Sequence, residues 1–322
     1  GAVSGLLNFK KEKKGGVRGH LNNMDKKKLL ISFSGGRTSA FMTKWLLENK
    51  KDEFDMVVVF SNTGREHEET LQFINKCDKE LNFNTVWIEP VTNPIAGIGI
   101  RAKVVDFDTA NRTGQPFEDI IKKYSIPNRT SPFCSEYMKK YAIRSFMKVQ
   151  MGLKNKEYQT AIGIRVDEFD RMIVHKKKER LVYPLVSMMP TRKEDVNKFW
   201  MNMPFDLQIK SYEGNCKSCW KKSIRKLMTI AKERPTDFDW DIEMENKYEN
   251  FIPEGRKDNL NIKPPLRFHR GNLSASKIIE MSKEPFELAK DESKNVIIYE
   301  QTTLFGIELD SSNGCEESCE AF

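Results

Sequence analysis

Long hydrophobic runs are absent from this sequence of 322 residues. Its longest apolar stretches are short and strand-like, as at Met56 to Phe60, whereas a membrane-spanning helix needs about 18 consecutive apolar residues. The N-terminus places its short apolar segment before a lysine cluster, which is the wrong order for a secretory signal. We therefore expect no membrane span and a cytoplasmic protein.

Internal repeats and low-complexity blocks are also absent beyond the N-terminal tail. With 39% hydrophobic and 31% charged residues, the composition argues against disorder of the whole chain. The length suits one large domain, or one domain with a substantial appendage. Cysteine is sparse, with six residues, and four of them form two close pairs, which in an intracellular chain indicates a metal site rather than disulfides.

Positive charge is concentrated at the N-terminus. Residues 1–28 carry eight basic and two acidic side chains, a local charge of +6 out of a net +8. Such a segment can contact nucleic acid, or it can be a solvated arm. We expect residues 1–27 to form a basic flexible tail, and we assign no function to it.

Strands and helices alternate after the tail. Short apolar runs that end in glycine or asparagine turns predict strands, and segments with helical apolar spacing predict helices. The strands are expected at 28–33, 56–60 and 85–88, and the helices at 39–48 and 68–81. This pattern predicts an α/β fold with a doubly wound parallel sheet over residues 28–210, followed by a smaller, mainly helical region at 211–322.

The later segments are expected to complete this plan. Glycine, proline and asparagine between Thr92 and Asn128 predict an irregular segment of the kind that forms substrate loops. The remaining predictions are helices from beyond Ser135 toward Val149, at 193–201 and at 274–288, a strand at 158–164, and a basic amphipathic helix opened by the first cysteine pair.

The segment between the first strand and the first helix has the composition of an anion site. Glycines there let backbone N–H groups converge, hydroxyls add donors, and the helix N-terminus contributes partial positive charge. The lysine of the Walker motif is missing. The expected phosphate contacts are Ser34, Gly35, Gly36, Arg37, Thr38 and Ser39. Taken alone, a glycine turn after a strand is also consistent with an ordinary turn.

Two further turns follow predicted strands, where open α/β sheets bind ligands. Asn62-Thr63-Gly64 is either a ligand turn or a plain structural turn. After Gly163, the cations Arg165 and Arg171 and the carboxylates of Asp167 and Glu168 are suited to phosphate and to Mg²⁺, or they form a surface ion-pair cluster.

The cysteines divide by their surroundings. Cys216 and Cys219, with Cys315 and Cys319, supply four thiolates, enough for tetrahedral zinc or a [4Fe–4S] cluster that ties the C-terminal end to the core; the alternative is unrelated free thiols.

Other single residues have two interpretations each. Cys134 precedes a predicted helix that carries Lys139 and Lys140, which together would lower the thiol pKa; otherwise it is an inert buried thiol. Cys77 lies on an apolar helical face and is expected in the core. His67 is expected to be solvated, and the alternative is that it faces the pocket.

These motifs together resemble a known family. SFSGGRTSA resembles the PP-loop of the ATP pyrophosphatase superfamily, and the later motifs resemble its phosphoadenosine-phosphosulfate reductase branch, including small phage proteins. The resemblance covers about residues 28–210. It is carried by SNTGREHEETLQFI at 61–74, PFCSEYMKKYAI at 132–143, GIRVDEFDR at 163–171 and YPLVSMMPTRKEDVNKFW at 183–200.

The resemblance implies roles for individual residues. It places the Asn62 turn beside an adenosine, Arg165 and Arg171 on nucleotide or substrate, and Cys134 and Lys139 beside the substrate. It implies an adenine nucleotide alpha hydrolase-like fold, and it favours iron over zinc. Two departures stand out: Thr38 replaces the usual aspartate, and the C-terminal ECG-type motif of true reductases is missing.

The expected function is an enzyme that binds ATP or an adenylyl nucleotide with Mg²⁺ and cleaves at the α-phosphate to adenylate an acceptor. Sulfur transfer to a nucleic acid (tRNA or DNA) or to a small molecule would follow, and the chain can be an oligomer. One alternative is a reductase of adenylyl sulfates. Another is a non-catalytic nucleotide or nucleic-acid binding protein with structural zinc.

Overall fold

The computed structural model describes residues 26–129, 131–172, 180–214, 216–254 and 263–295. The predicted basic tail lies almost entirely outside the described residues, as do Cys315 and Cys319.

A single six-stranded sheet organises the described part of the chain. Its strand order is β4-β3-β2-β1-β5-β6, and every neighbouring pair is parallel except the antiparallel pair of β3 and β4. The strands are β1 (Lys27–Ser32), β2 (Phe54–Ser61), β3 (Val86–Val91), β4 (Arg101–Val105), β5 (Gln159–Ala161) and β6 (Leu181–Val182).

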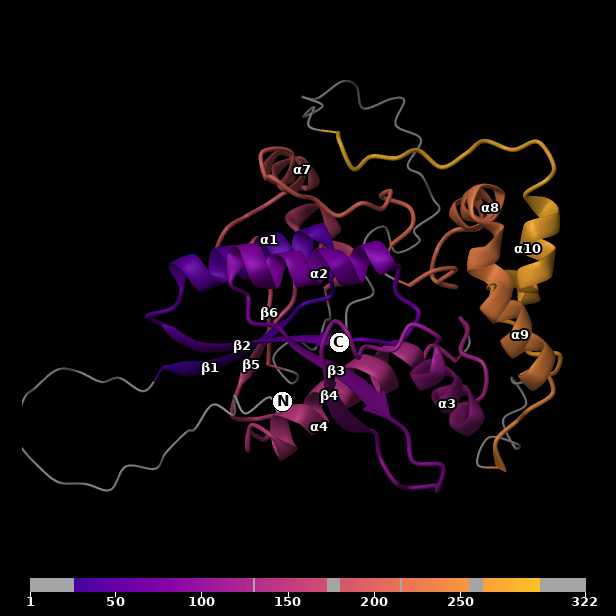
Figure 1. Cartoon of the computed structure of the whole chain (residues 1–322), viewed down its shortest axis with the longest axis horizontal. Coiled ribbons are helices and arrows are strands. Elements are labelled where there is room, and N and C mark those ends of the chain that lie inside the picture. Colours follow the sequence, from indigo (N-terminus) through magenta and orange to yellow (C-terminus); the bar gives the residue numbers. More distant parts are fainter. Residues whose placement is uncertain (1–25, 130, 173–179, 215, 255–262, 296–322) are drawn as a thin grey trace, which may run out of the picture.

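Helices cover both faces of this sheet, which confirms the predicted doubly wound α/β class. In Figure 1, α1, α2 and α7 lie above the sheet, α3 and α4 lie below it, and α8, α9 and α10 stand at one side. The α-helices are α1 (Arg37–Asn49), α2 (Glu68–Leu81), α3 (Gln115–Tyr124), α4 (Ala142–Val149), α6 (Pro184–Ser187), α7 (Lys193–Met201), α8 (Ile224–Glu233), α9 (Asp239–Tyr248) and α10 (Ala275–Met281). Shorter turns are the π-helix η1 (Ser135–Tyr141) and the 3₁₀ helices η2 (Val166–Arg171), η3 (Pro235–Phe238) and η5 (Arg270–Asn272).

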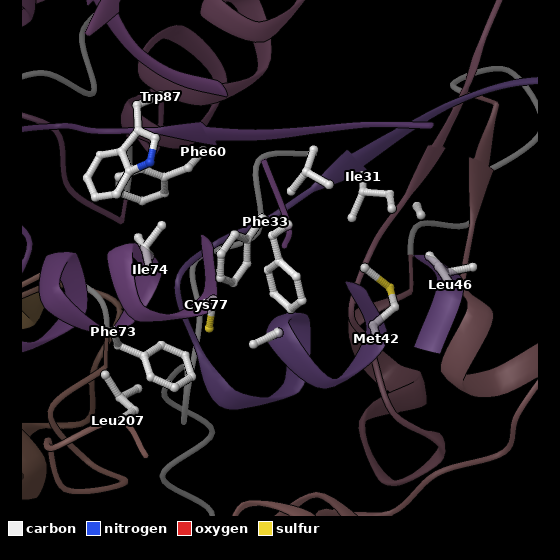
Figure 2. Close-up of a cluster of buried hydrophobic side chains, with 14 of the residues drawn as sticks. Ile31, Phe33, Met42, Leu46, Phe60, Phe73, Ile74, Cys77, Trp87 and Leu207 are labelled. Atoms are coloured by element: carbon white, nitrogen blue, oxygen red, sulfur yellow. The ribbon is translucent and has the colours of Figure 1, made fainter. Parts of the chain in front are cut away.

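The central strands are buried on both faces because their side chains alternate between two cores. Leu29 and Ile31 of β1 join the core beneath α1 and α2, whereas Leu30 joins the core on the side of α3 and α4. Figure 2 shows the first of these cores, where Ile31 and Phe33 lie near Met42 of α1. This continuous apolar character is why β1 was recognisable from sequence.

The strongly periodic elements were predicted closely. The structure places α2 at Glu68–Leu81 and α7 at Lys193–Met201, the bounds expected from apolar spacing. Cys77 is fully buried on α2, as expected, and burial raises the pKa of its thiol. Both helices carry a pronounced apolar stripe, which is the strongest local indication of a helix.

The irregular segment expected between Thr92 and Asn128 is wrong in part. It contains the edge strand β4 and the ten-residue helix α3. Gly114 adopts a left-handed conformation at the N-cap of α3, and Pro116 lies in the first turn, a combination that begins helices as well as loops. The helix expected at 274–288 is also shorter, because α10 ends at Met281.

The C-terminal helices share a core with the sheet. Trp220, Met244 and Phe268 belong to the same apolar cluster as Phe117 of α3, and the rings of Phe117 and Trp240 are 5.2 Å apart. The boundary between 28–210 and 211–322 stays a prediction. None of the helices within the described ranges has both the length and the apolar character to cross a bilayer.

Candidate functional site

The phosphate loop, residues 33–36 between β1 and α1, has the strained turn that the glycines predict. Gly35 has φ +82°, and a Cβ there would lie 2.8 Å from Thr70 Cγ2 and 2.9 Å from Ile74 Cδ1. The hydroxyls of Ser34 and Ser39 are 2.9 Å apart at the start of α1. Hydroxyls and a helix N-terminus are therefore gathered in one place, as an anion site requires.

Arg37 does not extend freely from this loop. Its Nε and Nη2 donate to the Asp206 carboxylate at 2.6 and 2.8 Å, and Nη2 also donates to the Leu207 carbonyl at 2.7 Å. The Trp200 indole donates to the Arg37 carbonyl at 3.0 Å. The side chain thus anchors the loop to the segment after α7, and a nucleotide contact from this residue would come from its backbone.

The Gly163 turn packs directly on the beginning of α1. A Cβ on Gly163 would lie 3.0 Å from Ser39 Cα, so the approach needs glycine. Arg165 is only 1% exposed and donates to Thr38 Oγ1 at 2.9 Å. The two predicted phosphate motifs therefore meet, and Thr38, which replaces the usual aspartate, is the acceptor that joins them.

Carboxylates surround this arginine. Asp167 accepts from Arg165 Nε at 3.1 Å, and Glu168 Oε2 lies 3.5 Å from Arg165 Nη1. Arg171, the other predicted phosphate contact, pairs with Glu168. The group is a charged network at the carboxyl end of β5, next to the phosphate loop.

The Asn62 turn at the end of β2 is held by residues that sequence reasoning missed. Asn62 Nδ2 donates to Glu89 Oε1 at 2.7 Å and to the Asn111 carbonyl at 2.9 Å. Gly64 has φ +79°. Glu89 is buried at the carboxyl end of β3; a lone carboxylate in an apolar strand was the signal that could have identified it.

Glu66 and His67 follow this turn and are both buried. The Glu66 carboxylate accepts from the Thr63 N–H and Oγ1 at 2.9 Å; burial raises its pKa, and the charge of Lys139 opposes that rise. His67 is 0% exposed, and neither ring nitrogen has a hydrogen-bond partner. The expectation of a solvated histidine was wrong: burial, with nearby cations, lowers its pKa to about 2.

Three cysteines from two distant segments line one cavity, called here the thiol cavity, of about 500 Å³ including its open mouth. Cys134 stands at the N-cap of η1, and Cys216 and Cys219 belong to the loop before α8. The helix expected after Cys134 begins at Ser135, though as a π-helix, and the predicted Lys139 is buried in the same wall. Other lining residues are Thr63, Arg65, Phe117, Ser135, Met138, Lys217, Ser218, Trp220, Asp241 and Phe268.

The loop at residues 216–223 before α8, called here the cysteine loop, is hydrogen-bonded to the two residues that follow the Asn62 turn. Glu66 and Cys216 form an antiparallel bridge, and Lys217 N–H donates to the Arg65 carbonyl at 3.0 Å. Buried Lys222 donates to the Cys216 carbonyl at 2.6 Å. Displacement of the turn would therefore move the thiols.

Arg65 reinforces this connection through its side chain. Its Nη2 donates to the Asp237 carbonyl at 3.0 Å and lies 3.6 Å from the Asp241 carboxylate, and its guanidinium is 4.5 Å from the Trp240 ring centroid. Burial raises the pKa of Asp241 to about 6 against the opposing effect of Arg65.

Only two of the four cysteines predicted to bind a metal lie within the described residues. Cys216 and Cys219 are half-buried thiols on the cavity wall, a donor set suited to zinc or iron. Cys315 and Cys319 lie outside the described residues. Within the described ranges, no group of three or more histidine, cysteine, aspartate or glutamate side chains is arranged to hold a metal ion.

Comparison with known proteins gives a consistent result. Residues 28–171 match the family described as phosphoadenosine phosphosulfate reductase domain. The nin region protein ORF290 of Escherichia phage lambda is 31% identical over 298 residues, which cover 91% of this chain and 94% of that protein. An uncharacterized protein of Methanocaldococcus jannaschii is 25% identical over 161 residues, or 49% of this chain and 31% of its own length.

Proposed function

The chain belongs to the phosphoadenosine phosphosulfate reductase domain family, and from this premise we propose that it binds ATP and cleaves it at the α-phosphate to adenylate an acceptor. Membership implies adenine nucleotide binding. The finer reaction rests on the phosphate loop: Gly35, Ser34 and Ser39 form a turn at the start of α1 that Arg165 reaches through Thr38. A cradle of this extent suits a pyrophosphate tail better than a single sulfonate.

The residues of the chain divide the work of such a reaction. Backbone N–H groups and the hydroxyls of Ser34 and Ser39 would hold the departing pyrophosphate, and Arg165 would offset the charge that develops on it. The Asn62 turn, fixed by Glu89, would orient the adenosine. Because these groups are already held in place, little reorganisation is needed during the reaction.

Mg²⁺ fits this site through Asp167 and Glu168, whose carboxylates lie beside Arg165. When bound, the ion would share the phosphate charge. The two carboxylates also hold Arg165 in position when no Mg²⁺ is bound. Their removal would therefore displace Arg165 in the metal-free and in the metal-bound protein.

We propose that the cysteines hold a [4Fe–4S] cluster, with zinc as the alternative. A bound cluster would supply or hold sulfur for an acceptor, either a nucleic acid or a small molecule. Cys134 shares the cavity with Cys216 and Cys219, so the ligand set needs a direct test. Iron measured after anaerobic purification should persist in Cys134→Ser and disappear in Cys315→Ser; the reverse result would make Cys134 a ligand.

Pyrophosphate release tests the proposed reaction. ATP incubated anaerobically with the protein and candidate acceptors should yield AMP and pyrophosphate. Ser34→Ala should lower the rate about tenfold, whereas Ser282→Ala, which removes another buried hydroxyl at the end of α10, should leave it unchanged. Equal rates for Ser34→Ala and the wild type would contradict the cradle.

A second candidate, reduction of adenylyl sulfates, is favoured by one observation. Cys134 lines the same cavity as the Cys216 pair and borders the Asn62 turn through Thr63, so a nucleophilic thiol and further thiols are close to the expected nucleotide. Sulfite release from an adenylyl sulfate in the presence of a dithiol, without pyrophosphate release from ATP, would establish this reaction instead.

A further inference from the structure

The thiol cavity is separate from the phosphate loop. Residues 33–36 do not line it, whereas Thr63 of the Asn62 turn and the neighbouring Arg65 do. A molecule in this cavity would therefore sit beside the nucleotide without competing for its phosphate site. The acceptor of the proposed reaction also has to lie beside the nucleotide.

The walls of the cavity are mainly apolar and aromatic. Phe117, Met138, Trp220 and Phe268 come from α3, η1, the cysteine loop and the segment before η5. Aromatic walls of this kind accept a flat ring, and stacking on aromatic side chains is how single-stranded nucleic acids are commonly held. The cavity is open to solvent on one side, so a ring can approach these walls from outside.

Trp220 offers its ring to this site. It lines the cavity and is 7% exposed, whereas its Nε1–H is buried out of reach of solvent. The part of Trp220 that a bound base can meet is therefore the ring.

Cations surround the mouth of the cavity. Lys217 is part of the lining, Lys221 Nζ donates to Ser135 Oγ at 2.9 Å, and Arg270 donates to the Lys221 carbonyl at 3.1 Å. Residues 216–234 hold seven basic side chains and one acidic one. Of the nearby acids, Asp241 lies 3.6 Å from Arg65 and Asp237 lies 3.9 Å from Lys217. The rim is suited to a phosphate backbone.

We propose that the thiol cavity binds one base of a single-stranded nucleic acid, with the base among Phe117, Trp220 and Phe268 and the adjoining phosphates against Lys221 and Arg270. This rests on the proposed function only for the claim that the bound base is the acceptor. A base within a duplex cannot pack against these walls unless it leaves the stack, so single strands are preferred.

Fluorescence anisotropy with labelled 12-nucleotide RNA, DNA and duplex probes tests the binding of the 322-residue chain. Single strands should bind more tightly than duplex, and the RNA and DNA arms identify the natural strand. Trp220→Ala should weaken binding about tenfold, and Trp220→Phe should restore most of it because a ring remains. The double substitution of Lys221 and Arg270 by Ala should lower the salt dependence of log Kd by about 1.4.

A matched control distinguishes the effect of the rim cations on binding from the effect of removing any positive charge. Lys79→Ala removes an exposed lysine near the C-terminal end of α2 and should leave binding unchanged. The N-terminal tail is present in every variant, so its contribution cancels. Equal single-strand affinity for folded Trp220→Ala and the wild type, or no single-strand binding at low salt, would overturn the proposal.

If Trp220→Ala does not fold, crosslinking to the wild-type protein tests whether a base binds in the thiol cavity. An RNA that carries 5-iodouridine, irradiated with the wild-type protein, should attach to peptides that contain Phe117, Trp220 or Phe268; attachment confined to other peptides would overturn the proposal. Binding is measured without ATP, so strand binding by a protein that releases no pyrophosphate would refute the proposed function and leave this site intact.

Discussion

The phosphate loop and the thiol cavity are built in opposite ways. The loop joins one strand directly to one helix, and the glycines and hydroxyls expected to bind phosphate lie within residues 33–39. The cavity takes its walls from α3, η1, the cysteine loop and α9, which are far apart in the sequence. A local site is dictated by turn chemistry, whereas an assembled site depends on how the whole chain packs, so the two should respond differently to substitution.

The largest expected effect is the difference in alkylation rate between the thiols of the cavity and the buried thiol of Cys77. Cys134, Cys216 and Cys219 line an open cavity, whereas Cys77 is fully covered by the core and its pKa is raised by burial. Iodoacetamide should modify the cavity thiols of metal-free protein at least about 100-fold faster than Cys77. Mass spectrometry of peptides over time measures this, and early modification of Cys77 would contradict the packing of α2.

Substitution of Gly35 by Ala should be the next largest effect. The new Cβ meets Thr70 and Ile74 within 3 Å at a left-handed φ, whereas Gly152, with φ +69°, has open space around it. Gly152→Ala therefore controls for backbone strain alone. We expect Gly35→Ala to weaken ATP binding about 30-fold, or about 2 kcal/mol, by calorimetry. Equal losses in the two variants would show that the loop is not sterically constrained.

The assembled region should depend on pH through Asp241. Its folded pKa of about 6 exceeds the unfolded value of 3.8, so the folded state binds more protons, and stability falls as pH rises from about 4 to about 6. Asn cannot ionise. The stability of Asp241→Asn relative to wild type should therefore increase by about 1–3 kcal/mol across that window.

Urea unfolding at several pH values measures this difference. His67 is present in both proteins, so its own titration cancels. Exposed Asp239 on the same helix provides the control, since Asp239→Asn should show no such trend. A difference that stays flat between pH 4 and 6 would mean that Asp241 is solvated.

The smallest expected effect concerns Arg37. If its side chain only anchors the loop to Asp206, a double-mutant cycle with Arg37→Met and Asp206→Asn should give a coupling of about 1 kcal/mol in unfolding free energy. The ATP affinity of folded Arg37→Met should change less than twofold. A larger loss of affinity would indicate that the Arg37 side chain contacts the nucleotide directly, as the sequence predicts.

Local patterns were sufficient for much of the fold. Buried strands of continuous apolar character, the stripes of α2 and α7, and the glycine turn before α1 each depend on neighbours within a few residues. Prediction failed at β4 and α3, where Gly114 and Pro116 served as a helix start rather than as loop residues. It also failed at His67, because burial depends on what covers a residue and not on its own polarity.

The sequence by itself determined the alternation of strands and helices, the glycine turn at residues 33–36 and the core position of Cys77, because backbone geometry and apolar periodicity act over short distances. Only the tertiary structure decided that Arg37 faces Asp206, that Arg165 reaches Thr38, and that Cys134 shares a cavity with Cys216 and Cys219. These contacts depend on which elements pack together, and the spacing of residues along the chain carries no information about that packing.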